Sequence, residues 1–498
     1  MSRLLRRTLL LLCLLLCILP VPAQDDRPSS KQAIIEQHLL DLEFETAQER
    51  LPILSSMAEV AYYGFSVRIY QYLATQDKQY FQDMRSVWRH TENAIEELPE
   101  SDRRRALLLA EIHCKRAAAE FIKGNYFSAV QYARSGRNYA IEQQQRFPKD
   151  QAIYKVLGVF NAMFGAVPSR YLWITEMLGY EGDVRQGLKQ LTTAAQIEQS
   201  YLPIEAVLFA SYIEKIMLNQ SEQSLERLLR ARKQHSPNAV LDYFCALAYM
   251  QNKQTEKALP FLQNQLASTN LGRTHMPYWD YQMGKAYYNR GNYQQAYPYF
   301  KRFLEKYRGK LFLTDAHFRL GMAYTLNGQY ASGKPYFSRL AERENSGFDQ
   351  DEYAAHLAQI FAERAPTTTE RSLFQARHFY DGGYFEKAEQ LLQNLNQQDG
   401  LSADNKTELY YRLGRLYHDQ KQLSKAVEHY QAGIEQAAQE EVWLQAYARY
   451  YLGEIARQQN RPQEARKQYE AALKYDDYWY QSGLENRCKT RLGEIKGS

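Results

Sequence analysis

Residues 283–300 read MGKAYYNRGNYQQAYPYF, and their spacing decides the fold. A small residue, Gly284, stands three positions before the aromatic Tyr287, and a second small residue, Ala296, stands four positions before Phe300. Gly291 lies between the two halves, where a helix would end in a turn. Small residues let two helices approach closely, and large rings fill the space beside them. The stretch therefore predicts two antiparallel helices joined by a short turn.

The same pattern returns three more times along the chain. Its glycines are Gly284, Gly321, Gly414 and Gly453, spaced 37 residues apart in the first pair and 39 in the last. The aromatic residues that take the place of Phe300 in the later copies are Phe337, Tyr430 and Tyr469. Weaker copies occupy residues 246–262 and 376–388. Repetition at this period indicates a solenoid, in which stacked helical hairpins share one continuous core.

This repeat resembles the tetratricopeptide repeat (TPR). The resemblance implies an all-α fold, a right-handed superhelical solenoid of antiparallel helix hairpins. We expect a C-terminal TPR array over residues 236–498. Upstream, residues 24–235 form a less regular helical region with degenerate TPR-like hairpins, of which Gly124 marks one turn. No run of alternating strand-like segments interrupts either part.

Residues 155–191 follow a different pattern. The helix predicted before Pro168 is apolar on almost all sides, so it must be buried. Three groups of residues occur here in an order that resembles the mitochondrial outer-membrane and inclusion-body-clearance TPR family: Phe160-Asn161, Pro168-Ser169-Arg170 and Gly179-Tyr180-Glu181-Gly182-Asp183. The resemblance implies an adaptor without established catalytic residues. We expect this segment to be core that fastens the N-terminal half to the array.

The first 23 residues have the layout of a secretory signal peptide. Three arginines precede an apolar stretch over residues 9–19, and small residues then lead to a cleavage position after Ala23. The stretch is about half as long as the roughly 20 residues of a spanning helix. We therefore expect an exported protein of the periplasm or cell surface. A twin-arginine signal, or a lipid anchor on Cys13 or Cys17, is the alternative.

Charge and cysteine content narrow the class of protein. The net charge of the whole chain is +5, and removal of residues 1–23, which hold three arginines and no acids, brings it close to neutral. This balance, with no long basic run, argues against a nucleic-acid partner. The remaining cysteines are Cys114, Cys245 and Cys488. An odd number spaced this widely is not a disulfide framework, so we expect buried free thiols.

Residues 328–335 have the spacing of a phosphate-binding P-loop without its chemistry. Lys334 stands where the P-loop lysine would, but Pro335 supplies no hydroxyl to hold Mg²⁺. A P-loop also follows a strand, whereas this segment falls on the turn of a repeat. We therefore predict no nucleotide binding.

Other signatures of catalysis or metal binding are missing from the sequence. No histidine pair has zinc-protease spacing, no cysteine pair has zinc-finger spacing, and no Gly-Xaa-Ser-Xaa-Gly motif occurs. We expect no catalytic residue, no cofactor and no metal, and hence no enzyme. A helical hydrolase with paired carboxylates remains an alternative, because such a pair needs no local motif.

The inner face of the array is the predicted partner site. The TPR resemblance implies that residues at fixed positions of each first helix line a concave groove. The chain holds 40 tyrosines, and tyrosine interleaved with arginine and lysine is typical of recognition surfaces. The predicted contact residues are Tyr278, Tyr281, Lys285, Tyr288, Asn289, Tyr411, Arg415, His418, Tyr447, Tyr450 and Arg457.

We expect this groove to bind a protein or peptide, so that the chain acts as a scaffold or adaptor. Since exposed tyrosines contribute little to stability, Tyr281→Ala with Tyr411→Ala should weaken partner capture and leave the melting temperature almost unchanged. Two alternatives stay open. The tyrosines pack between neighbouring helices, or they stack on sugar rings as in helical outer-membrane proteins that bind glycans or nutrients.

Overall fold

The computed structural model describes residues 31–165, 182–197, 201–235, 238–267, 272–341, 349–436 and 438–496. These residues form 24 α-helices, and no strand occurs among them, which confirms the predicted all-α class. The predicted signal peptide and much of the family-like segment, including residues 168–170, lie outside the described residues. Among the described helices, none is both long and apolar enough to cross a membrane.

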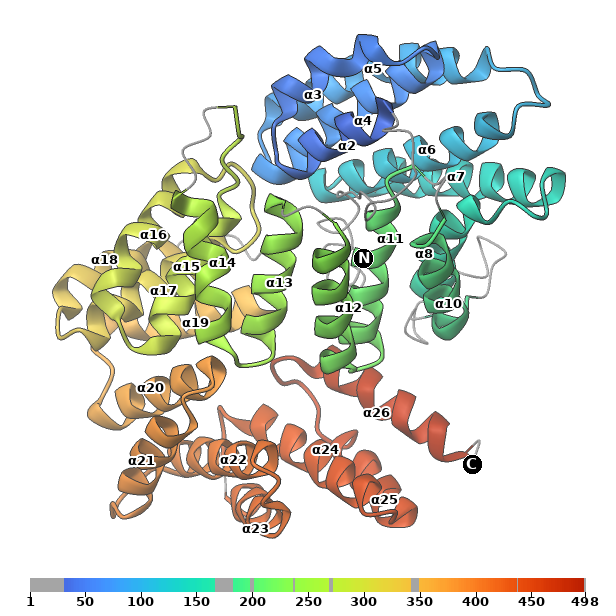
Figure 1. Ribbon diagram of the computed structural model, residues 1–498. Coiled ribbons are helices and arrows are strands. Elements are labelled where there is room, and N and C mark those ends of the chain that lie inside the picture. Colours follow the sequence, from blue (N-terminus) through green and yellow to red (C-terminus); the bar gives the residue numbers. More distant parts are fainter. Residues whose placement is uncertain are drawn as a thin grey trace.

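Helices of the N-terminal half pair into hairpins in the upper and central part of the molecule (Figure 1). They are α2 (Lys31–Leu40), α3 (Phe44–Arg50), α4 (Met57–Thr75), α5 (Lys78–Glu96), α6 (Arg103–Lys123), α7 (Tyr126–Arg146), α8 (Tyr154–Gly165), α10 (Val184–Ala194), α11 (Pro203–Tyr212) and α12 (Ser221–Gln234). A π-helical turn, Ile213–Met217, continues α11. The pairs α4–α5, α6–α7, α8–α10 and α11–α12 pack against each other.

The C-terminal half continues the hairpins more regularly. Its helices are α13 (Ala239–Gln251), α14 (Thr255–Ala267), α15 (Tyr278–Arg290), α16 (Tyr293–Lys306), α17 (Leu313–Leu326), α18 (Tyr330–Ala341), α19 (Asp349–Glu363), α20 (Thr368–Gly382), α21 (Phe385–Asn396), α22 (Ala403–Asp419), α23 (Leu423–Ile434), α24 (Val442–Gln458), α25 (Pro462–Ala472) and α26 (Gln481–Lys496). Each predicted strong copy of the repeat is one such hairpin.

Close packing inside each hairpin explains the repeated glycines. A methyl group placed on Gly284 of α15 would come within 2.8 Å of the Phe300 ring of α16. The equivalent approaches are 2.7 Å for Gly321 to Phe337, 2.6 Å for Gly414 to Tyr430 and 2.5 Å for Gly453 to Tyr469. At the turn, Gly291 has a φ of 84°, a backbone conformation that residues with a side chain rarely adopt. The predicted helix pairing is therefore confirmed.

One hydrophobic core includes buried residues from Ile35 to Phe361. It is therefore continuous across residue 235, the boundary that the sequence predicts between the two parts of the chain. Helix α8 is part of it, since Val156 and Phe160 are buried, as expected for the apolar segment. Beside them Lys155 Nζ lies 2.9 Å from Glu111 and 2.8 Å from Glu205, and all three side chains are buried. This ion cluster joins α6, α8 and α11 inside the core.

The described cysteines carry free thiols, as predicted. Cys245 and Cys488 are buried, and Cys114 is half-buried. Burial raises the pKa of each thiol to about 12. Because the thiolate is the reactive form, these cysteines are inert at neutral pH.

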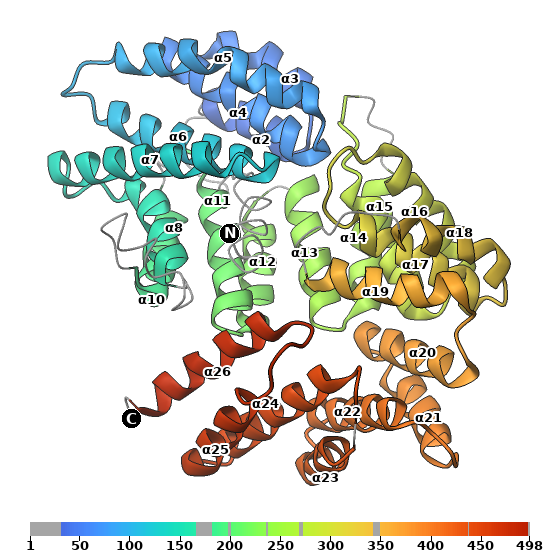
Figure 2. The same ribbon diagram turned by 180° about the vertical axis from the view of Figure 1, so that it is seen from behind.

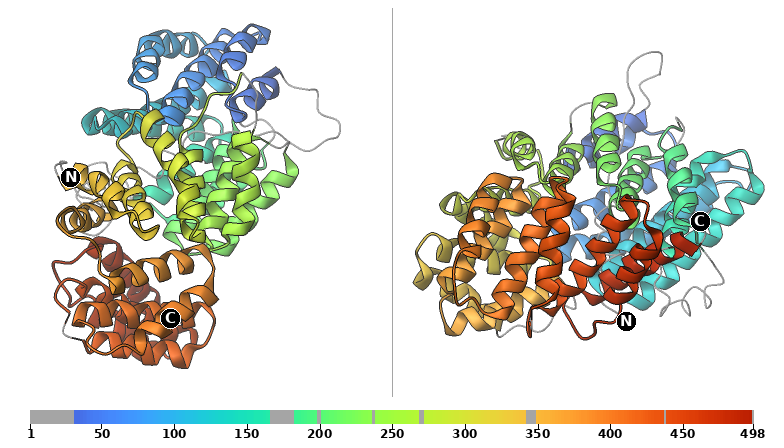
Figure 3. Two further views of the ribbon diagram at one scale, coloured as in Figure 1. Left: turned by 90° about the vertical axis from the view of Figure 1, so that its left-hand side faces the viewer. Right: turned by 90° about the horizontal axis from the view of Figure 1, so that it is seen from below.

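The array curves until its last helix returns to its middle. Figures 1 and 2 both show α26 beside the lower end of α12, and Arg487 of α26 acts electrostatically on Lys215 in the π-helical turn. Helix α20 also contacts α13 and α15, and Lys253 forms an ion pair of 2.7 Å with Asp419 of α22. Figure 3 gives two further views of this curvature. The inner helices therefore surround an interior, where the sequence predicts an open groove.

Candidate functional site

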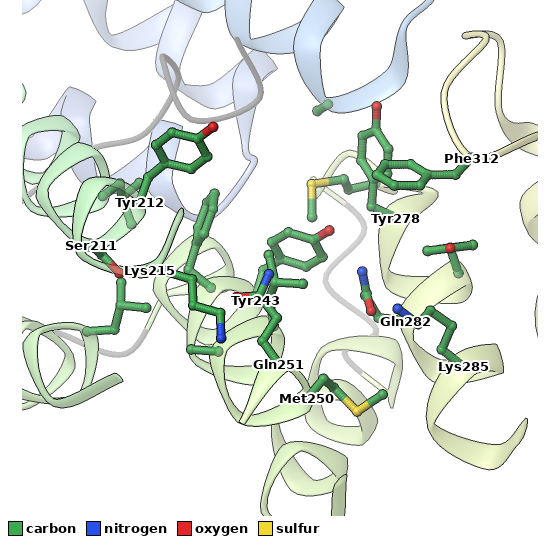
Figure 4. A pocket seen from close by; sticks show the side chains of 18 of the residues that line it. Ser211, Tyr212, Lys215, Tyr243, Met250, Gln251, Tyr278, Gln282, Lys285 and Phe312 are labelled. Carbon is green, nitrogen blue, oxygen red and sulfur yellow. The ribbon is translucent and has the colours of Figure 1, made fainter. Parts of the chain in front are cut away.

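A cavity of about 420 Å³ lies in the interior of the curved array. Residues of α2, α3, α4, α11, α12, α13, α15, α17 and α20 line it, so it is built from both halves of the chain (Figure 4). We call it the inner cavity. A volume of this size is typical of a site for a small molecule or a short chain segment.

The inner cavity contains part of the predicted contact set, namely Tyr278, Tyr281, Lys285 and Asn289. The two tyrosines are only 2% and 1% exposed. The Tyr278 hydroxyl lies 3.0 Å from that of Tyr307, and Tyr281 donates a hydrogen bond to Asp315 of the next hairpin. The prediction that these tyrosines are exposed is wrong, because their rings fill the space between α15 and the following hairpin.

Other predicted contact residues are buried for the same reason. The Tyr288 ring lies 3.9 Å from that of His378, across the contact between α15 and α20. Tyr411, Tyr450 and Asn289 are also buried. Their expected exposure is corrected as well, because each packs against neighbouring helices. At these positions the alternative holds, in which the tyrosines pack between neighbouring helices.

The rest of the predicted set lies on α22 and α24. Arg415, His418 and Tyr447 are half-buried, and Arg457 is exposed. Arg415 donates a hydrogen bond of 2.6 Å to the Tyr451 hydroxyl, and its guanidinium carbon lies 4.0 Å from the centre of that ring. We use the name inner C-terminal face for the side chains Arg377, Arg415, His418, Tyr447 and Arg487.

Sequence reasoning missed cations on the inner helices. Arg377 follows the small Ala376 of α20, as Lys285 follows Gly284 and Arg415 follows Gly414. A basic residue directly after the small residue is a signal that the sequence carries in these three copies, although Met322 and Glu454 take the same place after Gly321 and Gly453. Burial, together with Arg319, Arg377 and Arg412, holds the pKa of His378 well below its ordinary value.

Carboxylates neutralise only part of the positive charge of the cations on the inner helices. Asp315 pairs with Arg319 at 2.6 Å, and Asp381 lies 4.0 Å from Arg377. Although burial alone would raise it, the nearby Arg319 and Lys285 bring the pKa of Asp315 down to about 2. In the part of the chain that the structure describes, no carboxylate lies within 4.0 Å of the half-buried cations Lys215, Lys285 and Arg415, or of Arg487, which is exposed. The interior therefore carries an excess of positive charge.

Within the described ranges, no group of three His, Cys, Asp or Glu side chains is arranged to hold a metal ion. Residues 328–335 form the turn at Gly328 and the start of α18, and the helix α17 precedes them. The residues that resembled a P-loop thus belong to a helical hairpin.

Family comparisons place the repeats in known groups. A tetratricopeptide-repeat model matches residues 281–348 and 434–481, and a second such model matches residues 407–440. The Iml2/Tetratricopeptide repeat protein 39 model matches residues 150–308, which include the segment that resembled a TPR family in the sequence. The chain is a TPR protein with an Iml2/Tetratricopeptide repeat protein 39 segment. Such families are in general noncatalytic scaffolds.

Solved structures with similar folds are distant from this TPR protein. A human IFIT1 dimer with PPP-AAAA shares 17% identity over 88% of this chain and 94% of its own, with a TM-score of 0.31. A tetratricopeptide repeat protein from Parabacteroides merdae shares 17% identity over 56% and 96%, with a TM-score of 0.29. Values this low carry no argument about function. No curated protein matches the sequence significantly.

Proposed function

We propose that this TPR protein is an exported scaffold that binds an acidic segment of a protein or peptide partner on its inner C-terminal face. The proposal rests chiefly on the interior cations that have no carboxylate partner among the described residues. Export is proposed from the signal-like residues 1–23 alone. TPR arrays bind partners along their inner helices, which supports the choice of this face over the outer helices.

The geometry of Arg415 suits recognition of a carboxylate. Tyr451 of α24 accepts a hydrogen bond from the Arg415 guanidinium, and its ring lies against that group. The centre of the Tyr380 ring, on α20, lies 5.6 Å from the same guanidinium. Its Nε has no hydrogen-bond partner within the described residues. A cation held in place loses less conformational entropy on binding than a free one. Arg415 is therefore held in a position from which it can donate hydrogen bonds to a partner's carboxylate.

Burial of the tyrosines weakens the glycan alternative. Stacking on a sugar needs exposed ring faces, whereas Tyr278, Tyr281, Tyr411 and Tyr450 are all buried between helices. The exposed chemistry of the interior is cationic. A peptide with acidic side chains complements it better than a neutral sugar does.

The test is capture of a partner from the envelope fraction by the purified protein, followed by mass spectrometry. Arg415→Gln and Arg487→Gln should each reduce capture at least several-fold, and added salt should reduce it further. Arg466→Gln is the matched control, because Arg466 lies exposed on the outer helix α25, paired with Glu470 at 2.8 Å. Capture that neither variant nor salt changes, or captured nucleic acid in place of protein, would contradict the proposal.

A further inference from the structure

The inner cavity changes in character from one end to the other. Along each of three helices that line it, an aromatic residue comes first and a polar residue follows one or two turns later. The pairs are Tyr212 and Lys215 on α11 and its π-helical turn, Tyr243 and Gln251 on α13, and Tyr278 and Lys285 on α15. In Figure 4, Tyr212, Tyr278 and Phe312 lie at one end, and the ends of Lys215, Gln251 and Lys285 lie toward the other.

Apolar side chains from the N-terminal half also line the inner cavity. They are Leu42, Phe44 and Leu73, and Phe244 and Phe312 line the same cavity. The first three are buried, so this part of the lining belongs to the folded core of the N-terminal half. An apolar chain placed here would be removed from water on several sides, which is the main source of affinity for such ligands.

The polar end carries two cations that lack ionic partners. Lys215 Nζ donates a hydrogen bond of 2.5 Å to Ser221, and Lys285 Nζ lies 5.7 Å from the centre of the Tyr281 ring. Burial, with Lys253 and Arg487 nearby, lowers the pKa of Lys215 to about 8. Burial and Arg319 lower that of Lys285 to about 8 as well. In Figure 4 the two lysines lie on opposite sides of the cavity, so one anionic group can contact only one of them and relieve its unfavourable environment.

A buried amide between the two ends is also incompletely bonded. Gln282 is 4% exposed and lines the cavity, and Figure 4 shows its amide directed into it, near Tyr243. Its Oε1 has no hydrogen-bond partner within the described residues. Gln282 also forms a side-chain hydrogen bond with Tyr243, so these two side chains mark where the lining changes from apolar to polar.

From this gradient we infer that the inner cavity binds a free long-chain carboxylate, with its chain among the apolar residues and its head group at Lys215. The limited volume favours one chain over a two-chain lipid. Lys215 suits the head group better than Lys285, because only the cations Lys253 and Arg487 act on Lys215, whereas the carboxylates Asp315 and Asp381 already act on Lys285. This ligand is additional to the peptide partner proposed for the inner C-terminal face.

The inference is tested by calorimetric titration of the purified protein with dodecanoate, below its micelle-forming concentration. Saturable one-to-one binding is expected, and methyl dodecanoate, which lacks the charge, should bind about tenfold more weakly. Hexanoate should also bind more weakly, because its chain fills less of the apolar end. This comparison of ligands needs no protein variant, so it holds even where a substitution disturbs folding.

Variants then locate the head group. Lys215→Gln should weaken dodecanoate binding about tenfold, since it removes one charge-assisted contact, whereas Lys285→Gln across the cavity should weaken it much less. Lys334→Gln, at an exposed position of α18, is the control and should bind as the wild type does. Circular dichroism confirms that each variant is folded. Equal binding of dodecanoate and its methyl ester, no saturable binding, or displacement of dodecanoate by the acidic peptide partner would overturn the inference.

Discussion

Tyr281 of α15 donates a hydrogen bond to the carboxylate of Asp315 on α17, the first helix of the next hairpin. Both residues are buried, and Arg319 pairs with the same carboxylate at 2.6 Å. The contact joins consecutive repeats through one tyrosine hydroxyl. Tyr281, which the sequence predicts to contact a partner, thus stabilises the stacking of consecutive repeats.

Tyr281→Ala should therefore destabilise the protein by about 3–5 kcal/mol, the usual cost of removing a buried aromatic side chain. Tyr281→Phe keeps the ring but leaves Asp315 with one hydrogen bond fewer, and should cost about 1–3 kcal/mol. Urea denaturation followed by circular dichroism measures both. Phe127→Ala is the control, because Phe127 is 77% exposed on α7 and its removal should change stability by less than about 0.5 kcal/mol.

The double variant Tyr281→Ala with Tyr411→Ala should lose stability, not partner capture alone. Both rings are buried in contacts between helices, so their losses should approximately add. An unchanged melting temperature together with reduced capture would restore the original expectation that these tyrosines form an exposed groove.

Gly284→Ala should cost about 1–3 kcal/mol, because the added methyl group meets the Phe300 ring at 2.8 Å and α15 and α16 must separate. Gly493→Ala in α26 meets nothing within 4 Å and should instead stabilise by up to about 1 kcal/mol, as alanine favours helix. Thermal unfolding of the two variants gives opposite shifts if the repeat glycines act through helix packing. Shifts of the same sign would mean that they do not.

Glu36 makes the stability depend on pH. Burial raises the pKa of Glu36 from 4.5 to about 8, while Tyr63 and the Leu202 backbone N–H donate hydrogen bonds to it. Between these two pH values the folded state binds more protons than the unfolded state, so stability falls as pH rises through this window.

Glu36→Gln removes that ionisation and keeps an oxygen acceptor. The variant should gain at least about 1 kcal/mol over the wild type at pH 8, and much less at pH 5. Urea denaturation at both pH values measures the difference. Glu97→Gln, an exposed position at the end of α5, should show no such dependence. A gain of equal size at pH 5 would show that Glu36 is not protonated in the folded protein.

The proposed export makes a chemical prediction. Sequencing the N-terminus of the protein recovered from its natural host should give Gln24 as the first residue, because cleavage is expected after Ala23. A chain that begins at Met1 would contradict export through this segment. A lipid-modified Cys17 would establish the anchored alternative.

The sequence by itself determined the helix pairs and their register. Gly284, Gly414 and Gly453 each lie against an aromatic ring of the following helix, at the spacing that the sequence shows. This information is local, because two helices joined by a short turn can bury their facing stripes in only a few ways. The apolar character of α8 likewise required burial before any neighbour was known.

Only the tertiary structure decided which inner side chains remain accessible. Tyr281 and Tyr411 occupy positions that an open array would expose, but here the next hairpin covers them. The curvature of an array is the sum of small rotations between repeats, so no single repeat records it. The inner cavity depends on the same sum, since residues as distant as Leu39 and Asp381 meet in it. The local spacing of residues therefore determines the fold, whereas the curvature of the whole array determines the site.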